Sequence, residues 1–579
     1  MGKANIFVQL KSFTTGKILS HYNLRENQIT PLSVVLPPNP EYGDFAFGCF
    51  NLAKIVRKSP AEIAQELAQV ILDPEWITKA NPMGPYVNFV INRERFIHNL
   101  LEQILSEGTN FGSETPESDT SVMVEYSSPN TNKPQHLGHV RNNVLGMAVG
   151  NILEKLGHKV IRTNLINDRG IHICKTMLAY QYWGEGNTPE PLGKKGDHFV
   201  GDLYVLFETR LKEDPQLIEE AQGLLRKWEQ GDAETLELWR TMNQWVYHGF
   251  DATYKRLGCH FDKIYYESNI WQSGKKIVLD ALDKGLCQRN HKGDTVINLE
   301  DKGLGEKVLL RADGTSIYIT QDIGTAVLKF DDFHMDNSLY VVASEQDHHF
   351  NVLFEVLRRF GYTWADKCYH LSYGMVYLPE GKMKSREGTV VDADNLMDEL
   401  VELAKQEIKV RDRDITGREL EMVSEHVGLG ALKYYILKVN PQKDITFNPA
   451  ESVSFDGATG PYLQYTHARV ASLMRNAGFT PGEQVVFDQL GNPEEMDIIQ
   501  KLAFFPETIR DSAQNYNPAV LCNYLYELAK AFNKFYHDHS ILNVDNQSLS
   551  YARTKLSQAV GIILKEGLRL LGIVAPERM

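Results

Sequence analysis

Apolar positions along residues 122–167 follow two different spacings. Residues 122–126 (VMVEY) and 158–167 (HKVIRTNLIN) are short apolar runs, the pattern of buried strands. Between them the buried stripe of an amphipathic helix recurs every four residues, at Val140, Val144, Ala148, Ile152 and Leu156. Gly157 is expected to end this helix. A strand, a helix and a strand in so short a span predict a parallel βαβ unit, and hence a doubly wound, Rossmann-like α/β sheet.

Residues 1–111 have the pattern of a small α/β domain. A helix over 59–72 is well signalled, because Ser59 is an N-cap, Pro60 takes the first helical position and Glu62 completes a capping box. A strand over 86–91 and a further helix after Asn92 are expected next. The polar stretch 112–121 is interpreted as a linker to the following domain.

The rest of the chain is predicted to contain a large α/β domain, 122–395, and a helical region, 396–579. A charged, aromatic and helical stretch at about 182–271 is interpreted as an insertion between the two halves of the nucleotide fold. Residues 308–330 are expected to open the second half of this fold, with a strand, a turn at 313–314 and a helix. A buried strand is expected within 338–350, and a strand followed by a Gly- and Lys-rich loop within 370–391.

Composition limits the classes that this protein can belong to. At 579 residues the chain is too long for one core, so two to four domains are expected. It shows no apolar run of membrane-spanning length and no secretory pattern at its start. The six cysteines are scattered and form no C-x-x-C pair, which favours a reducing cytoplasm. The net charge of −14 neither supports nor excludes RNA, because a large enzyme can carry a local basic surface.

Two histidines mark the predicted junction of the first strand and its helix. His136 and His139 are three residues apart, so they share one face of the first helical turn. Gly138 between them removes a side chain, which allows a flat or anionic ligand to approach the backbone. A helix start attracts phosphate, and two imidazoles there can donate hydrogen bonds to it. Taken alone, the pattern fits two surface histidines equally well.

The helix predicted within 308–330 carries a second candidate site. Tyr318 and Asp322 are four residues apart and therefore point the same way on a helix. An apolar-flanked carboxylate needs a cationic partner if it is buried. A guanidinium would suit, since it docks on a carboxylate through two hydrogen bonds and stacks on a phenol ring. The alternative is an Asp placed near a helix start by the dipole alone.

Adjacent histidines at 348 and 349 do not predict a metal site. Neighbouring residues of a regular strand or helix cannot both face one ion. The D-H-H triplet also occurs in a phosphoesterase family, but the additional Asp motifs that such a two-metal site needs are absent from the sequence.

Residues 129–139, PNTNKPQHLGH, resemble the HIGH-type signature of class I aminoacyl-tRNA synthetases, and more narrowly its arginyl form. The resemblance runs through essentially the whole chain and ends at LGIVAPERM. It implies an ATP-dependent ligase that activates L-arginine and transfers it to tRNA(Arg), with Mg²⁺ entering with ATP and no zinc or tightly bound cofactor. It also implies an N-terminal domain that reaches the tRNA elbow, a C-terminal anticodon-binding domain, a cytoplasmic location and a monomer.

The loop KMKSREG, residues 382–388, is similar to the KMSKS signature, which closes over ATP and neutralises the departing pyrophosphate. Aligned without gaps, the loop has Ser385 where the signature has its second lysine. Arginyl enzymes often lack that lysine, and in them a lysine just ahead of the HIGH-type motif resembles a substitute. Lys133 occupies that position here.

The resemblance implies a role for each of the matching residues. The catalytic candidates are His136, His139 and Lys133. The ATP-binding candidates are Gly138, Met375, Lys382, Lys384, Ser385 and Arg386. The arginine-binding candidates are Glu125, Asn130, Tyr318, Asp322 and Gln346. The tRNA-binding candidates, which begin the anticodon-binding domain and mix stacking with cationic groups, are Tyr462, Gln464, Tyr465, His467 and Arg469.

Three other functions remain open on the sequence. One is a class I synthetase for another amino acid, which would not need Asp322 and Glu125 to converge. Another is a small nucleotidyltransferase, which would not need the helical C-terminal third. The third is a catalytically silent tRNA-binding relative, suggested by Ser385 in the signature loop.

Overall fold

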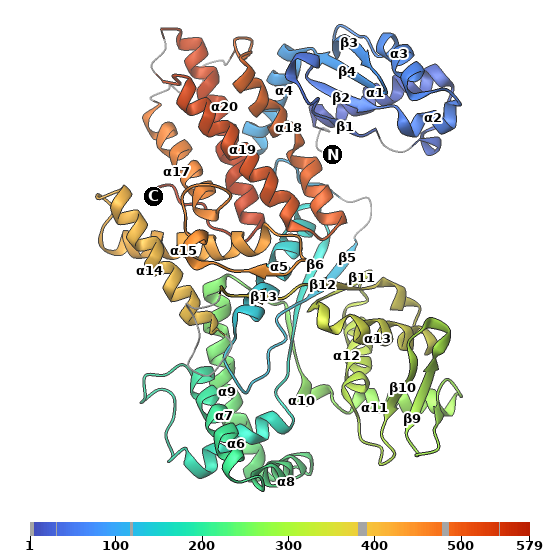
Figure 1. Ribbon diagram of the computed structural model, residues 1–579, viewed down its shortest axis with the longest axis vertical. Helices are drawn as coiled ribbons and strands as arrows, with labels where there is room; N and C mark the ends of the chain where they lie inside the picture. Colours follow the sequence, from blue (N-terminus) through green and yellow to red (C-terminus); the bar gives the residue numbers. More distant parts are fainter. Residues whose placement is uncertain (1–4, 30–31, 116–119, 380–390, 478–485, 543–544) are drawn as a thin grey trace.

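The computed structural model describes residues 5–29, 32–115, 120–379, 391–477, 486–542 and 545–579. Figure 1 shows three tiers: the N-terminal domain and a bundle of C-terminal helices at the top, a parallel sheet in the middle, and two lobes below it. None of the helices in the described ranges combines the length and the apolar character needed to cross a bilayer.

A four-stranded antiparallel sheet, in the order β1–β2–β4–β3, forms the N-terminal domain with four helices. Its elements are α1 (Ile6–Tyr22), β1 (Val34–Val35), β2 (Phe45–Gly48), α2 (Phe50–Val56), α3 (Pro60–Val70), β3 (Ile77–Met83), β4 (Tyr86–Ile91) and α4 (Arg93–Glu107). The predicted capping box is confirmed, since the Ser59 hydroxyl accepts from the Glu62 N–H and the Glu62 carboxylate accepts from the Ser59 N–H.

A five-stranded parallel sheet, in the order β12–β11–β5–β6–β7, forms the centre of the molecule. Its elements are β5 (Ser121–Glu125), α5 (Leu137–Lys155), β6 (Lys159–Ile166), β7 (Lys263–Tyr266), β11 (Asn337–Ala343) and β12 (Cys368–Tyr373). The predicted stripe of α5 is buried, and Gly157, at φ +82°, follows its last turn as expected. The doubly wound parallel sheet is therefore confirmed.

The order of the strands locates the ligand crevice. From β5 the chain passes to β6 and β7 on one side, and it later returns to β11 and β12 on the other side. Ligands of open α/β sheets bind outside the carboxyl ends of the strands where the order reverses. Here that point lies at the ends of β5 and β11, next to the start of α5.

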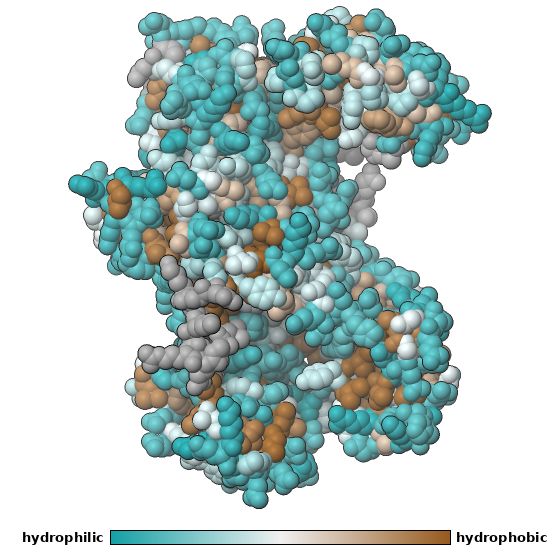
Figure 2. All heavy atoms as spheres, viewed as in Figure 1, coloured by the Kyte–Doolittle hydropathy of each residue, from teal (hydrophilic) through white to brown (hydrophobic). Residues whose placement is uncertain are grey.

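Two lobes extend below this edge of the sheet, and the surface is indented between them (Figures 1 and 2). One lobe is helical and contains α6 (Ile171–Trp183), α7 (Gly196–Glu213), α8 (Leu217–Glu229) and α9 (Ala233–Leu257). The other pairs an antiparallel sheet, β10–β9–β8, with helices. Its elements are α10 (Glu267–Ile270), α11 (Ser273–Asp283), β8 (Gln288–Arg289), β9 (Thr295–Leu299), β10 (Gly305–Leu310), α12 (Tyr318–Phe333) and α13 (Asp347–Arg359).

Two details predicted for the large α/β domain differ from the structure. β7 lies within the predicted range of 182–271 but pairs with β6, so it belongs to the central sheet. β10, expected to open the second half of the nucleotide fold, pairs with β9 in the antiparallel sheet instead. The apolar pattern of a short strand does not specify its partner, which accounts for both errors.

Helices make up most of the C-terminal part. They are α14 (Ala393–Arg411), α15 (Gly417–Leu437), α16 (Pro449–Ser452), α17 (Gly460–Asn476), α18 (Pro493–Gln514), α19 (Pro518–Asp538) and α20 (Gln547–Leu570), with the short parallel pair β13 (Val376–Tyr377) and β14 (Ile445–Thr446). The bundle contacts the end of α5 through a buried ion pair of 3.0 Å between Lys155 and Glu566. It contacts the N-terminal domain through rings 4.8 Å apart, Phe7 and Phe504.

Candidate active site

His136 and His139 lie together at the start of α5, where β5 ends. His136 is the N-cap, with extended backbone, and its Nδ1 accepts from the Gly138 N–H at 3.1 Å. The Nδ1 of His139 accepts from the His136 N–H at 3.2 Å, and the two rings are 4.0 Å apart. A backbone N–H can only donate, so both Nδ1 atoms are unprotonated. Each neutral ring therefore carries its hydrogen on Nε2, where it is available to a ligand.

The surroundings hold both rings neutral. Burial, together with the nearby Lys133 ammonium, lowers the pKa of His136 to about 4. Burial also holds the pKa of His139 well below its usual value, with smaller contributions from His136 and Lys133. At neutral pH this helix start therefore offers two hydrogen-bond donors and one lysine charge.

Gly138 is required by the ring beside it. A Cβ at this position would lie 2.9 Å from Cε1 and 3.0 Å from Nδ1 of His136. Any larger residue would displace the imidazole from its cap. From the sequence, Gly138 was expected only to let a ligand approach the backbone, and in the structure it also leaves room for the His136 ring.

A cavity of about 700 Å³ opens in front of the two histidines. Four short segments and Val391 line it: the segments are the turn after β5, the start of α5, the end of β11 with the turn that follows it, and residues 373–378. His136, Gly138, His139 and Met375, all predicted site residues, are brought together here. Sequence reasoning missed Ser127, Ser128, Asn142, Glu345 and Tyr373, which also line the cavity.

Ser127 and Ser128 form an unusual turn at the end of β5. Both have left-handed backbone, at φ +80° and +47°, which is uncommon for residues other than glycine. The Ser128 N–H donates to Asn164 at 3.0 Å, and the Ser127 hydroxyl lies 2.6 Å from that of Tyr254. The only sequence signal for this turn was its place directly after a buried strand.

A second cavity, of about 410 Å³, lies beside the first. It shares His136 with the larger cavity and adds Lys133, residues of α7 and the start of α14. The His136 ring therefore stands between the two spaces. Lys133 is half-buried in this wall, close enough to affect both imidazoles.

Asp322 and Glu125 lie on α12 and at the end of β5, and each has a partner within the chain. Asp322 Oδ2 lies 2.6 Å from His349 Nε2, and its side chain is one-third exposed. The buried Glu125 carboxylate forms an ion pair with the buried Lys329. Burial raises the pKa of Tyr340 well above its usual value, with smaller contributions from Cys368, Glu125 and Asp322. Both carboxylates therefore lie near one tyrosine of β11.

The other arginine-site candidates are open to solvent. Tyr318, one turn before Asp322 on α12, is 79% exposed. Asn130 and Gln346 are also exposed. Asp322 is thus a partly accessible carboxylate with an exposed phenol on the same side of the helix, whereas Glu125 is already neutralised.

The predicted signature-loop residues Lys382, Lys384, Ser385 and Arg386 lie outside the described residues. The chain just after this loop is attached to the start of α5. The Leu137 N–H donates to Val391 O and the Ala393 N–H donates to Gln135 O, both at 3.0 Å.

The five tRNA-binding candidates all lie on α17, but two of them are internal. Gln464 is fully buried, and its amide donates to the carbonyls of His426 at 2.9 Å and Val574 at 2.7 Å. His467 is also buried, with Nδ1 2.9 Å from Pro576 O. The prediction is wrong for these two residues, because both hold the C-terminal tail and cannot reach RNA. Polar and aromatic residues occur on both the buried and the exposed face of α17, so the periodicity of the sequence did not show which of them are buried.

Tyr462, Tyr465 and Arg469 remain candidates for contact with RNA. All three are half-buried. The Arg469 guanidinium stacks between the rings of Tyr465 and Tyr536, at 4.9 and 5.0 Å. A fixed cation held between two rings suits unpaired bases.

One group of side chains has the spacing of a metal site within the described ranges. Asp197, His198 and Asp394 bring their ligand atoms within 4.8 Å of one another. The Lys195 ammonium, however, already contacts Asp197 at 3.0 Å and Asp394 at 2.6 Å. A lysine cation thus supplies the charge that these carboxylates need.

Comparisons with known proteins match all three parts of the chain. A family model described as "tRNA synthetases class I (R), catalytic domain" matches residues 100–449. Models described as "Arginyl tRNA synthetase N terminal domain" and "DALR anticodon binding domain" match residues 15–91 and 463–579.

Curated relatives and a solved structure are similar over nearly the full length. An arginine–tRNA ligase of Parabacteroides distasonis is 46% identical over 561 residues, covering 93% of this chain and 94% of the relative. One of Treponema denticola is 45% identical, covering 95% of each chain. The structure of Thermus thermophilus arginyl-tRNA synthetase superimposes with a TM-score of 0.83 at 29% identity, covering 99% of each chain.

Proposed function

The chain belongs to the class I arginyl-tRNA synthetases, which are arginine–tRNA ligases, and we propose that the cavity at the start of α5 is where ATP activates L-arginine. A carboxylate oxygen of arginine attacks the α-phosphorus of ATP, and the bond from that phosphorus to pyrophosphate breaks. The 2′-hydroxyl of the terminal adenosine of tRNA(Arg) then attacks the arginyl carbonyl carbon and releases AMP. Mg²⁺ enters with ATP as part of the substrate.

The observation that carries this assignment is the pair of neutral imidazoles. The Nδ1 atoms of His136 and His139 are used at the helix start, and among the described residues neither Nε2–H has a hydrogen-bond partner beside the 700 Å³ cavity. Donors that are already fixed in place stabilise charge as it develops on the α-phosphate. Lys133 is proposed to neutralise the phosphates from the same wall, with Met375 lining the cavity as well. Positioning and charge stabilisation account for the rate, without a covalent enzyme intermediate.

We propose Asp322 as the partner of the arginine guanidinium. It is a partly exposed carboxylate at the sheet edge where ligands bind, and the Tyr318 ring lies on the same side of α12. A guanidinium would replace the contact that Asp322 now makes with His349. Glu125 is proposed to lie near the bound guanidinium while it remains paired with Lys329. Asn130 and Gln346 are proposed to hold the amino-acid end.

Charging of a tRNA(Arg) transcript with radiolabelled arginine tests the overall function. We expect arginyl-tRNA to form when ATP is present and none to form when ATP is left out. Nucleotide transfer to a small molecule without tRNA would instead support the nucleotidyltransferase alternative. Binding of tRNA without any charging would support a silent relative. The cytoplasmic location and the monomeric state remain predictions.

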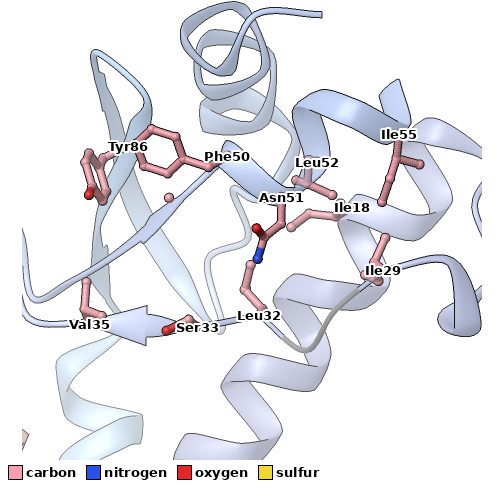
Figure 3. A pocket seen from close by; sticks show the side chains of 11 residues that line it. Ile18, Ile29, Leu32, Ser33, Val35, Phe50, Asn51, Leu52, Ile55 and Tyr86 are labelled. Atoms are coloured by element: carbon pink, nitrogen blue, oxygen red, sulfur yellow. The ribbon is translucent and has the colours of Figure 1, made fainter. Parts of the chain in front are cut away.

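The N-terminal domain is proposed to contact the elbow of the tRNA through a cavity of its own. This cavity, of about 250 Å³, is mostly apolar and lies between α1, α2 and the β1–β2–β4 face (Figure 3). The exposed rings of Phe50 and Tyr86 meet at 5.5 Å along its rim, and the Asn51 amide lies across from them. A base that leaves the RNA stack can pack on such rings and form hydrogen bonds with an amide.

Replacing Asn51 or Tyr86 with alanine should raise the KM for tRNA(Arg) in charging by about 10-fold, the value of one stacked or hydrogen-bonded base. The KM values for arginine and ATP should not change, because the variants lie in a separate domain. Met83→Ala is the matched control. Met83 is exposed on β3, directly opposite Tyr86 of β4, and it does not line the cavity. An unchanged KM for tRNA in both variants would rule out this contact.

A further inference from the structure

Arg141 is a fully buried arginine on α5, two residues after His139. Its guanidinium donates to four backbone carbonyls. Nη1 donates to Gly374 O at 2.6 Å and to Met375 O at 2.9 Å. Nη2 donates to Pro441 O at 2.9 Å and to Lys443 O at 2.7 Å. One side chain therefore joins three segments that are far apart in the sequence.

Removing this charged group from water costs free energy, and hydrogen bonds to four carbonyl oxygens offset that cost. In the described part of the chain no carboxylate forms an ion pair with Arg141. Burial lowers its pKa to about 10, with opposing contributions from Tyr373 and Asp444, so the group stays charged at neutral pH. A buried cation needs a hydrogen-bond acceptor for each donor. Only a planar fork can serve four acceptors on two segments, and a lysine ammonium cannot.

The two segments that carry these four carbonyls are also hydrogen-bonded to each other. The Gly374 N–H donates to Pro441 O at 2.9 Å, and the Met375 N–H donates to Asp444 at 2.7 Å. β13 then pairs with β14. Packing here is tight, because a Cβ on Gly374 would lie 2.6 Å from both Asp444 Oδ1 and the Lys443 carbonyl carbon.

The same segment forms a wall of the nucleotide cavity. Residues 373–378 line the cavity on one side, and His136 and His139 line it from the start of α5. Arg141 lies on α5 as well and holds Gly374 and Met375 of that wall by their carbonyls. This guanidinium is therefore a direct link between the helix that carries the imidazoles and the opposite wall.

We propose that Arg141 is a positioning residue for the nucleotide: it fixes the wall formed by residues 374–378 at the distance from the two histidines that ATP requires. This inference rests on the proposed function, because it assumes that ATP occupies the cavity. Arg141 does not line the cavity and acts through the backbone of Gly374 and Met375. Displacement of a binding wall by about an ångström is enough to cost a large factor in rate.

The test compares Arg141→Lys with Arg553→Lys. Arg553 is also a buried arginine on a helix, and it donates to Glu495 and to Ser540 O in the C-terminal bundle. Two quantities are measured for each variant: the dissociation constant of a non-hydrolysable ATP analogue with no arginine present, and the KM values for ATP and arginine in ATP–pyrophosphate exchange. The melting temperature is recorded alongside.

We expect Arg141→Lys to weaken binding of the analogue and to raise the KM for ATP by about 10-fold or more, with the KM for arginine changed less than about 2-fold. Arg553→Lys should lower the melting temperature and leave both KM values as in the wild type. Gly374→Ala forces the wall away from residues 443–444, so it should also raise the KM for ATP and leave the KM for arginine almost unchanged. This second variant tests the proposal if Arg141→Lys does not fold.

Equal changes in both KM values, or no change in analogue binding, would overturn the proposal and leave Arg141 with a structural role only. The binding measurement needs no arginine and no turnover. A wild-type protein that bound the analogue but failed to activate arginine would contradict the proposed function. The effect of Arg141→Lys on the dissociation constant of the analogue would still be measurable in that case.

Discussion

Replacing Lys133 with alanine should lower the rate of arginine activation by about 100-fold or more, the usual consequence of removing one group that stabilises developing charge. Lys133 is half-buried in the wall that carries His136, and its charge reaches both imidazoles. The signature loop has Ser385 where a second lysine would stand, and Lys133 is a cation that the described residues place beside His136. The measurement is single-turnover formation of arginyl adenylate.

Lys159→Ala is the matched control for this experiment. It removes the same charge from an exposed residue at the start of β6, the opposite edge of the sheet. It should leave the rate unchanged. A wild-type rate in Lys133→Ala would show that Lys133 does not replace the missing lysine, and would direct attention to Lys382 and Lys384.

Asp322→Asn should lower kcat/KM for arginine by about 100-fold, mainly through KM, while the KM for ATP stays constant. Asparagine keeps the size of the side chain but loses its charge and the paired acceptors that a guanidinium fork requires. Loss of one member of a desolvated charge pair commonly costs about 2–5 kcal/mol, a factor of 30 or more. Steady-state exchange at varied arginine measures this effect.

Asp331→Asn on the same helix is the corresponding control. Asp331 is exposed and lies nine positions further along α12. Its variant should bind arginine like the wild type. If Asp322→Asn also did so, the guanidinium would have to bind elsewhere, and the assignment built on α12 would be lost.

Much of the fold could be predicted because its signals are local. The stripe of α5, the capping box at Ser59 and the left-handed glycine at 157 each depend on neighbours within a few residues. The partners of β7 and β10 could not be predicted in this way, since pairing joins segments that are distant in the sequence. An entire antiparallel sheet was therefore missed.

The candidate site shows the same division. The spacing of His136 and His139 predicted that they would meet, and they do. Nothing in the sequence indicated that Glu125 would be neutralised by Lys329, 204 positions away, or that Gln464 would hold residue 574. Such contacts depend on how distant parts of the chain pack together, and the order of apolar and polar residues in the sequence does not predict them. The family resemblance named arginine, which spacing alone did not.

ATP–pyrophosphate exchange measured across the amino acids, with and without tRNA(Arg), tests the central claim most directly. With tRNA present, the enzyme should catalyse exchange with arginine, because the two imidazoles at the start of α5 stabilise the α-phosphate of ATP. Lysine should fail, because a point charge cannot form the paired contact with Asp322. Robust exchange with arginine alone among the amino acids is the predicted result. Exchange driven by a different amino acid, or none with arginine and tRNA together, would contradict it.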